Sequence, residues 1–384
     1  MLFFKGNWDM KNFKAGTYVS QGSYKSFQPE LLNRLWQIDD MSVLALLSKA
    51  DRFLGRLDMY SEYVDIELFI QMHIAKEATQ SSRIEGTQTR VEEAFLNKAD
   101  VQAEKRDDWE EVQNYIQAMN EAVKMLHTLP FSTRLIKRAH KILLHGVRGQ
   151  HKMPGEFRRS QNWIGGASLA DAVFIPPVHT EVGKLMSDIE HFANVQDDHL
   201  PDLIKIAMIH YQFETIHPFL DGNGRTGRLL ITLYLVHKGI LKRPILYLSD
   251  FFERHRELYY ENLMRVRTHN NMAQWLKFFL AGIVETAQKG VEALNGIMQL
   301  KQSIEKQIDV LGKRGADARV VLNHLYKKPV ISPAETATLI NKTPQTAYNL
   351  IADLEELGIL REKTGAQRNK LYSFEPYINL FENL

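Results

Sequence analysis

Residues 217–228 read HPFLDGNGRTGR, and they follow an apolar stretch, IKIAMIHYQFETI, whose pattern predicts a helix. The DGNG segment predicts a loop, after which a second helix begins near Asn223 or Gly224. Gly222 and Gly224 permit positive φ and let the backbone approach a ligand closely. The first N–H groups of a helix are unpaired, and together with the helix dipole they favour an anion such as phosphate. The stretch therefore predicts two helices joined by an anion-binding loop.

The polar side chains of this stretch suit the phosphates of a nucleotide. Arg225 and Arg228 are three residues apart, so they project from one face of the new helix, and each guanidinium can bind two phosphate oxygens. Asp221 is a hard oxygen ligand suited to Mg²⁺ that bridges phosphates. His217 can accept a proton near neutral pH. Each residue alone is common in a solvated turn or helix, but their joint occurrence at a helix start indicates phosphoryl or nucleotidyl transfer.

Composition limits the class of protein. The chain has 384 residues, 44% of them hydrophobic and 24% charged, a net charge of +2 and no cysteine. These values are typical of a globular protein with a sizeable core, and they exclude disulfides and thiolate chemistry. The most apolar window, residues 275–284, is too short to span a bilayer, and the first residues lack the apolar region of a signal peptide. We expect a soluble cytoplasmic protein without a membrane partner.

Helical periodicity dominates the chain, so a mainly α fold is predicted. Within it, the first 35 residues look irregular, with an extended arm, and the pattern from 36 to about 100 is helical. Residues 150–180 are rich in Gly and Pro and predict a loop with a small hairpin that ends at Pro176 and Pro177. We expect four parts: an N-terminal helical region, a catalytic core, a helical connector and a C-terminal domain, at residues 1–105, 106–290, 291–315 and 316–384.

The C-terminal part has its own pattern. Ser332–Pro333 and Thr343–Pro344 each pair a capping residue with a proline suited to the first helical turn. Residues 359–374 then alternate around a turn at Thr364–Gly365. Three helices followed by a two-stranded wing predict a winged helix-turn-helix.

A carboxylate stands in an unfavourable place near residue 85. The periodicity of residues 65–80 predicts a helix that Gly86 ends with a left-handed cap. Glu85 then lies in the last turn, where the helix dipole disfavours it by a few tenths to about 1 kcal/mol. Two explanations stay open at this point, namely solvent exposure and a cationic partner elsewhere in the chain. Glu67 and Glu77, earlier in the helix, are interpreted as solvated charges.

Three stretches resemble one family. HPFLDGNGRTGR matches the HxFx(D/E)GNGRxxR signature of Fic-domain proteins at every specified position. GEFRRSQNWIGG followed by AVFIPP resembles the segment that forms the flap of that family. SSRIEGT, from Ser81 through Glu85 to Gly86, resembles its inhibitory motif (S/T)xxxE(G/N), and it lies upstream of the core, as in the class with an N-terminal inhibitory helix. The resemblance covers roughly residues 30–290 and implies a Fic helical core with a small β-hairpin flap.

The resemblance implies an activity, because Fic proteins mostly transfer AMP from ATP to a Ser, Thr or Tyr hydroxyl of a protein. His217 would deprotonate that hydroxyl, and Asp221 would hold Mg²⁺ on the α- and β-phosphates. The anion hole would come from Asn223 and from the backbone between Gly222 and Gly224. Arg225 would contact the α/β-phosphates and Arg228 the γ-phosphate.

Further roles follow from the same resemblance. The flap, residues 163–177, would bind an extended stretch of the protein substrate by β-augmentation. Glu85 would pair with Arg228 and so inhibit productive ATP binding. Tyr259 and Tyr260 are candidates for packing near the adenine, although a Tyr pair in an amphipathic helix more often belongs to the core.

Other functions stay open at the level of sequence. Some Fic proteins with an inhibitory glutamate remove AMP, so Glu85 could instead, or in addition, position a water. Others transfer phosphate or UMP. A third alternative is a DNA-binding regulator acting through the C-terminal domain, but residues 317–384 contain eight Lys+Arg and eight Asp+Glu, without a net basic charge. The alternative to DNA binding is that this domain mediates contacts with other proteins or self-association.

Overall fold

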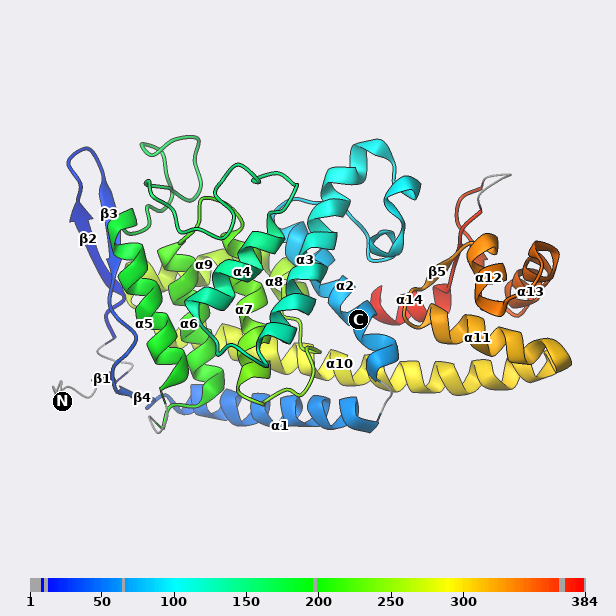
Figure 1. Cartoon of the computed structure of the whole chain (residues 1–384). Coiled ribbons are helices and arrows are strands. Elements are labelled where there is room, and N and C mark those ends of the chain that lie inside the picture. Colours follow the sequence, from blue (N-terminus) through cyan, green and yellow to red (C-terminus); the bar gives the residue numbers. More distant parts are fainter. Residues whose placement is uncertain (1–7, 10–12, 64–65, 196–198, 366–369, 383–384) are drawn as a thin grey trace.

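The computed structural model describes residues 8–9, 13–63, 66–195, 199–365 and 370–382, and it is mainly helical, as predicted. Figure 1 shows the longest helix, α10 (Met272–Ile308), running along the molecule from the core to the C-terminal helices. Helix α1 (Met41–Tyr63) packs beside it. Apolar residues of α1 recur every three or four positions and are buried, among them Val43, Leu47, Ala50, Leu54 and Leu57. No described helix is both long and apolar enough to cross a membrane.

The core is a group of helices that surround α6 (Asp202–Ile216) and α7 (Asn223–His237). Every residue of α6 from 203 to 216 is buried, as expected of a central helix with apolar residues on all sides. Met208 and Phe213, both fully buried, belong to this core. The surrounding helices are α3 (Arg106–Met125), α4 (Thr133–Leu143), α5 (Val182–Asn194), α8 (Ser249–Arg254) and α9 (Arg256–His269).

Helix α2 (Ile66–Ile84) lies between the core and the C-terminal helices. It ends as predicted, because Gly86 has φ 106° and the N–H groups of Gly86 and Thr87 donate to the carbonyls of Arg83 and Ser82. The interpretation of Glu77 as a solvated charge is wrong. This side chain is buried and accepts hydrogen bonds from Tyr115 and Ser249, because α2 is covered on more than one side.

The N-terminal residues contain strands that the sequence pattern did not predict. β2 (Gly16–Ser20) and β3 (Lys25–Pro29) form an antiparallel hairpin, and β1 (Trp8–Asp9) pairs with β4 (Trp36–Gln37) in parallel. The expectation of irregular structure is therefore wrong for these segments, whereas the expected extended arm is present as β3; residues 1–7 and 10–12 lie outside the described part. Helix is also absent between Ile84 and α3 in the described chain, which instead has 3₁₀ turns at Glu93–Phe95, Lys98–Asp100 and Ala103–Lys105.

The C-terminal unit, residues 315–382 without 366–369, contains the three predicted helices and the two strands that follow them, but also a strand between the first two helices and a final helix that were not predicted. Ser332 and Thr343 accept hydrogen bonds from the N–H groups of Glu335 and Thr346, as capping residues do. The unit contains a three-stranded antiparallel sheet in the order β5-β7-β6. DNA binding by this unit stays a prediction. Its elements are α11 (Gly315–Leu325), β5 (Val330–Ile331), α12 (Pro333–Ile340), α13 (Pro344–Glu356), β6 (Arg361–Glu362), β7 (Tyr372–Ser373) and α14 (Glu375–Glu382).

Helix α14 was not predicted, and it connects the C-terminal unit to the rest of the molecule. It packs against α10, and its residue Tyr377 contacts Phe69 of α2 with ring centroids 6.1 Å apart. In Figure 1, α14 lies beside α2, while its first residue, Glu375, pairs with Arg361 and Lys363 of the wing, each at 3.0 Å.

Candidate active site

One cavity of about 670 Å³ brings together all the site residues predicted from the sequence. Its walls come from the end of α2, the loop between α6 and α7, the start of α7, the flap (residues 163–177) and α9. The predicted residues in its lining are Glu85, His217, Asp221, Gly222, Asn223, Gly224, Arg225, Arg228, Tyr259 and Tyr260.

The loop before α7 leaves backbone N–H groups facing the cavity. Gly222 has φ 72°, and the first hydrogen bond of the helix joins the Thr226 N–H to the Gly222 carbonyl. The N–H groups of residues 223–225 precede this bond and so point out of the helix start. The side chain of Asn223 holds the loop, because it accepts from the Phe219 N–H and donates to the Phe219 carbonyl, both at 2.9 Å. Any anion would therefore be bound by the backbone rather than by the Asn223 amide.

His217 occupies an unusual backbone position that turns its side chain into the cavity. It ends α6 in the left-handed region with φ 49°, and its carbonyl accepts from Arg158 and Asn162 at 3.0 and 3.1 Å. Burial lowers the pKa of His217 to about 3, and the charges of Arg267 and Arg158 act in the same direction. Its Nδ1 has no hydrogen-bond partner among the described residues. The ring is therefore neutral.

Asp221 offers a single carboxylate to the cavity. Its Oδ1 accepts from the Gly222 N–H at 2.6 Å, and its side chain is 41% exposed. Its carbonyl accepts at 2.9 Å from His140, whose ring stacks on Phe219 with centroids 3.7 Å apart. The described residues contain no group of three or more His, Cys, Asp or Glu that could hold a metal ion. The partly exposed carboxylate of Asp221 could hold a hard cation at the cavity wall.

Arg225 is paired with a carboxylate that the sequence did not reveal. Its Nη1 donates to Glu111 Oε2 at 2.9 Å, and both side chains are at most 5% exposed. The other oxygen of Glu111 accepts from Arg148 Nε at 2.7 Å, and Arg148 also reaches Asp108 at 2.8 Å. Glu111 therefore lies between two arginines that line the cavity.

Arg228 makes the contact predicted with Glu85. Its Nη2 lies 2.6 Å from Glu85 Oε1, while Nε donates to the Ser81 hydroxyl and Nη2 to the Ser81 carbonyl, both at 2.9 Å. Arg228 is 1% exposed, whereas the Glu85 side chain is 37% exposed. Burial acts to raise the pKa of Glu85, but the charge of Arg228 outweighs it and the pKa is lowered.

The Glu85 carboxylate also covers the anion-binding backbone. A Cβ added to Gly224 would lie 2.2 Å from Glu85 Oε1, so this oxygen is in contact with the start of α7. The space where phosphate is expected is thus next to a carboxylate of the chain itself.

Glu214 is another carboxyl that sequence reasoning missed. It is buried in the cavity wall, one turn before His217, and its Oε1 has no hydrogen-bond partner among the described residues. Burial raises the pKa of Glu214 to about 7, although the charge of Arg228 opposes this. A carboxylate within the largely apolar run 203–216 was the available signal.

The two tyrosines differ in what they can do. Tyr259 is 1% exposed, stacks on Phe252 and bonds through its hydroxyl to His210 Nε2 at 2.8 Å, so it is chiefly a core residue. Tyr260 is 41% exposed and lines the cavity. Tyr260 is therefore the better placed of the two to meet a ligand.

The flap is held by few backbone bonds. A single antiparallel bridge joins Ile164 to Phe174, so the predicted hairpin is minimal. The Phe27 N–H of β3 donates to the Ile175 carbonyl at 2.9 Å, which attaches the N-terminal hairpin to the second arm. Trp163 and Val173 remain exposed, at 39% and 66%.

These observations define a helical protein with an anion-binding helix start beneath a small hairpin. Comparison with known families is more specific, because residues 44–124 match the model described as Fic/DOC family N-terminal and residues 130–235 match the Fic/DOC family model. The chain therefore contains a Fic/DOC N-terminal segment and a Fic/DOC domain.

Curated relatives cover part of the chain. The protein named Protein adenylyltransferase Fic from Culex quinquefasciatus is 35% identical over 125 residues, which are 32% of this chain and 22% of that protein. The protein of the same name from Drosophila mojavensis is 42% identical over 86 residues, 22% of this chain and 16% of the relative. The chain thus matches about a fifth of the length of these relatives.

Solved structures share the fold at low identity. A Fic family protein from Desulfovibrio desulfuricans G20 has a TM-score of 0.55 and 18% identity, with 88% of this chain and 96% of that chain covered. A Fic domain containing signaling protein from Bacteroides thetaiotaomicron VPI-5482 has a TM-score of 0.50 and the same identity, with 66% and 97% covered. These similarities establish the fold alone.

Proposed function

We propose that this chain transfers AMP from ATP to a Ser, Thr or Tyr hydroxyl of a protein and that Glu85 inhibits the transfer. The observation that carries the proposal is the shared cavity, where His217 and the start of α7 with its two arginines face the same space. The names of the curated relatives support the same activity.

The geometry suits an in-line attack on the α-phosphate. Neutral His217 takes the proton of the target hydroxyl while the hydroxyl oxygen bonds to the α-phosphorus, and the bond to pyrophosphate breaks. The N–H groups of residues 223–225 bind the α-phosphate oxygens, and Arg225 neutralises charge beside them. Arg228 binds the γ-phosphate once Glu85 leaves it. Most of the rate enhancement then comes from orientation and fixed charges.

Asp221 would hold Mg²⁺ that arrives with ATP. When bound, the ion supplies positive charge next to the phosphates. The partly exposed carboxylate at the cavity wall suits this role, because it leaves the remaining ligand positions to phosphate and water.

The inhibition rests on the position of Glu85. The carboxylate pairs with the arginine proposed for the γ-phosphate and contacts Gly224 at the helix start. Opposite charges 4 Å apart interact by about 4 kcal/mol at an effective dielectric constant of 20, but desolvation and the exposed side of Glu85 reduce this. The inhibition is therefore partial and reversible.

The flap and the tyrosines complete the substrate sites. An extended segment of the target protein pairs with the flap, residues 163–177, next to His217. The second arm already bonds to Phe27, so the free edge is the arm that contains Trp163. The exposed ring of Tyr260 packs near the adenine, with Tyr259 behind it.

Labelled ATP tests this proposal directly. The protein and its Glu85→Gly variant are incubated in a cell lysate with ATP labelled on the α-phosphate, and label on protein is measured. Glu85→Gly is expected to raise labelling at least tenfold, and His217→Ala in the same background to abolish it. Unchanged labelling in Glu85→Gly would refute the inhibition, and full labelling in the His217→Ala variant would refute the mechanism.

Removal of AMP is a second candidate function. Glu85 and His217 line the same cavity, so the partly exposed carboxylate could position a water for attack on a protein-bound AMP. Release of AMP from a target labelled by Glu85→Gly measures this reaction. Release by the wild-type protein but not by the variant supports it, and no release by either refutes it.

A further inference from the structure

One row of side chains on α2 connects the C-terminal unit to the candidate active site. Phe69, His73, Glu77, Ser81 and Glu85 are spaced by four residues, so they form a continuous row along the helix. Four residues exceed one turn by about 40°, and the row therefore winds around the helix as it proceeds. Its first members face the C-terminal unit, and its last member is the inhibitory glutamate.

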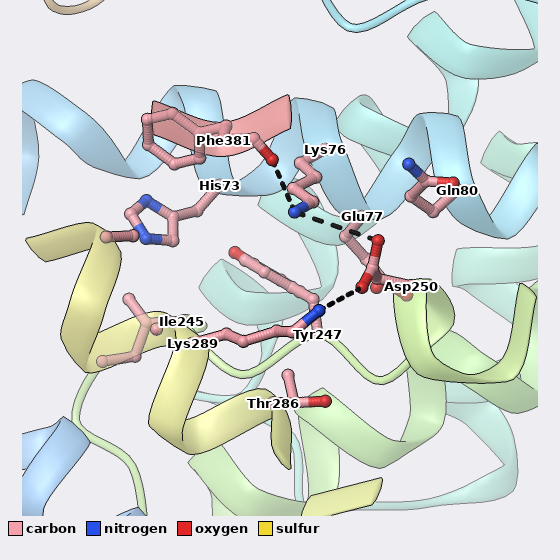
Figure 2. A pocket seen from close by; sticks show the side chains of 12 residues that line it. His73, Lys76, Glu77, Gln80, Ile245, Tyr247, Asp250, Thr286, Lys289 and Phe381 are labelled. Carbon is pink, nitrogen blue, oxygen red and sulfur yellow. Dashed lines mark hydrogen bonds and ion pairs between the residues drawn. The ribbon is translucent and has the colours of Figure 1, made fainter. Parts of the chain in front are cut away.

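The first part of the row is held by α14 and α11. The Phe69 ring lies edge-on to Tyr326, with centroids 5.2 Å apart, and also contacts Tyr377. The His73 ring lies edge-on to Phe381 at 4.9 Å. Lys76 on the next turn donates to the Phe381 carbonyl at 2.7 Å (Figure 2). The end of α14 is thus bound to α2 by a ring contact and a charged hydrogen bond.

The last part of the row is held by the Fic core. Glu77 accepts from the Tyr115 hydroxyl at 3.0 Å and from the Ser249 hydroxyl. Ser81 accepts from Arg228, and Glu85 pairs with the same guanidinium. Any displacement of α2 along or around its axis therefore changes the contacts of Arg228.

The junction between α14 and α2 is not closely packed. A cavity of about 50 Å³ lies there, and Figure 2 shows residues that line it, among them His73, Lys76, Asp250, Lys289 and Phe381. Both lysines lie 3.9 Å from Asp250, beyond hydrogen-bond distance. His73 is buried, yet its Nε2 has no hydrogen-bond partner among the described residues. Such a contact costs less to separate than a fully packed and satisfied one.

We propose that the C-terminal unit controls the inhibition, because α14 holds α2 in the position that places Glu85 on Arg228. This inference rests on the proposed function and adds a regulator to it. A partner that draws α14 away from α2 releases Glu85 and so permits transfer. Because coupling is reciprocal, removal of Glu85 from Arg228 also weakens the attachment of α14.

The test is a double-mutant cycle on the full chain. Phe381→Ala removes the ring contact with His73 at the end of α14, and the AMP-transfer rate is measured with and without Glu85→Gly. We expect Phe381→Ala to raise the rate about fivefold in the wild-type background, at the lower end of typical coupling between sites. In the Glu85→Gly background, Phe381→Ala should leave the transfer rate unchanged. No increase in the wild-type background, or equal increases in both, would overturn the inference.

Two further variants separate coupling from general destabilisation. Phe381→Leu keeps an apolar side chain and should retain most of the inhibition. Leu350→Ala removes a buried side chain from α13, which packs on α11 and α12, and should leave the rate within twofold of the wild type. A fivefold increase with Leu350→Ala would mean that any damage to the C-terminal unit is sufficient, and the specific role of α14 would be refuted.

Hydrogen exchange provides a readout that needs no transfer activity. Amides of residues 375–382 should exchange about fivefold faster in Glu85→Gly than in the wild-type protein, with amides of α12 unchanged. If Glu85→Gly fails to raise transfer but accelerates exchange in α14, the proposed function fails while the coupling stands. Unchanged exchange in α14 would refute the coupling.

Discussion

Two arginines three residues apart on α7 are each paired with a carboxylate from an earlier helix, but the two pairs differ in burial. Glu111 comes from within α3, is 4% exposed, and also binds Arg148. Glu85 comes from the end of α2, is 37% exposed, and stands where the helix dipole disfavours it. The first pair is part of the folded core, whereas the second can separate without opening the core. One of the two arginines proposed to bind phosphate is thus held in the core, while the pair of the other can separate.

The largest expected effect is on stability when the buried pair is broken. Glu111→Ala removes the close counter-charge of the buried Arg225, leaving only the longer contact with Asp221 at 3.8 Å, and should lower the free energy of unfolding by about 3–5 kcal/mol. Glu85→Ala should lower it by about 1 kcal/mol or less, because water in the cavity replaces the carboxylate and Ser81 still binds Arg228. Urea denaturation of both variants measures the difference. Equal losses of unfolding free energy in Glu111→Ala and Glu85→Ala would contradict the distinction between the two pairs.

A slightly smaller effect is expected from Glu214, a carboxyl near Arg228 that forms no ion pair with any residue in the described part of the chain. Its pKa is raised from 4.5 to about 7, so its contribution to stability is fully present below about pH 4.5 and lost as the pH rises to about 7. At about 1.4 kcal/mol per pKa unit the loss is about 3 kcal/mol. Glu214→Gln should remove this part of the pH dependence.

Urea denaturation at several pH values between 4.5 and 8 compares Glu214→Gln with the wild-type protein. The control is Glu253→Gln on α8, a carboxyl outside the cavity lining. A variant that loses stability with pH as steeply as the wild type would show that Glu214 is ionised throughout, and Arg228 would then have a second permanent counter-charge.

The smallest expected effect concerns salt. Raising the ionic strength from about 0.05 to 0.5 M shortens the Debye length from more than 10 Å to less than 8 Å, which weakens partly exposed pairs more than buried ones. The transfer rate of the wild-type protein should therefore rise about twofold relative to the rate of Glu85→Gly. Salt also weakens ATP binding, and the change in the Glu85→Gly rate corrects for that effect. If the ratio of the wild-type rate to the Glu85→Gly rate does not change with ionic strength, the Glu85–Arg228 pair is as protected from solvent as the Arg225–Glu111 pair.

Local features of the site could be predicted from the sequence. The glycine at residue 222 and the start of α7 follow from short-range backbone preferences, and so do the cap at Gly86 and the two capped helices of the C-terminal unit. The contact between Glu85 and Arg228 needed more than local physics, because the dipole argument could not choose between solvent and a partner. The family resemblance supplied the partner, and the structure shows the contact.

The missed residues share one physical reason. Glu77, Glu111 and Glu214 are carboxylates on helices that other elements cover on several sides. Sequence periodicity identifies one buried face of a helix but does not show what packs against its remaining faces. Glu111 directly precedes Val112 and stands four residues before Tyr115, both buried. A carboxylate within such an apolar stripe was the available signal, but its partner Arg225 lies 114 residues away. The strands before residue 40 were missed because they are short and depend on contacts such as that between Phe27 and Ile175.

The origin of the two carboxylates has a consequence for recombining parts of related proteins. The segment that matches the Fic/DOC model, 130–235, contains both arginines, but Glu85 and Glu111 belong to the preceding matched segment, 44–124. A fragment limited to residues 130–235 would carry both buried guanidinium groups without Glu85 or Glu111, and Arg225 would keep only the longer contact with Asp221 at 3.8 Å. Chimeras between relatives should therefore exchange residues 44–235 as one piece, with the boundary placed before α2 rather than between the two matched segments.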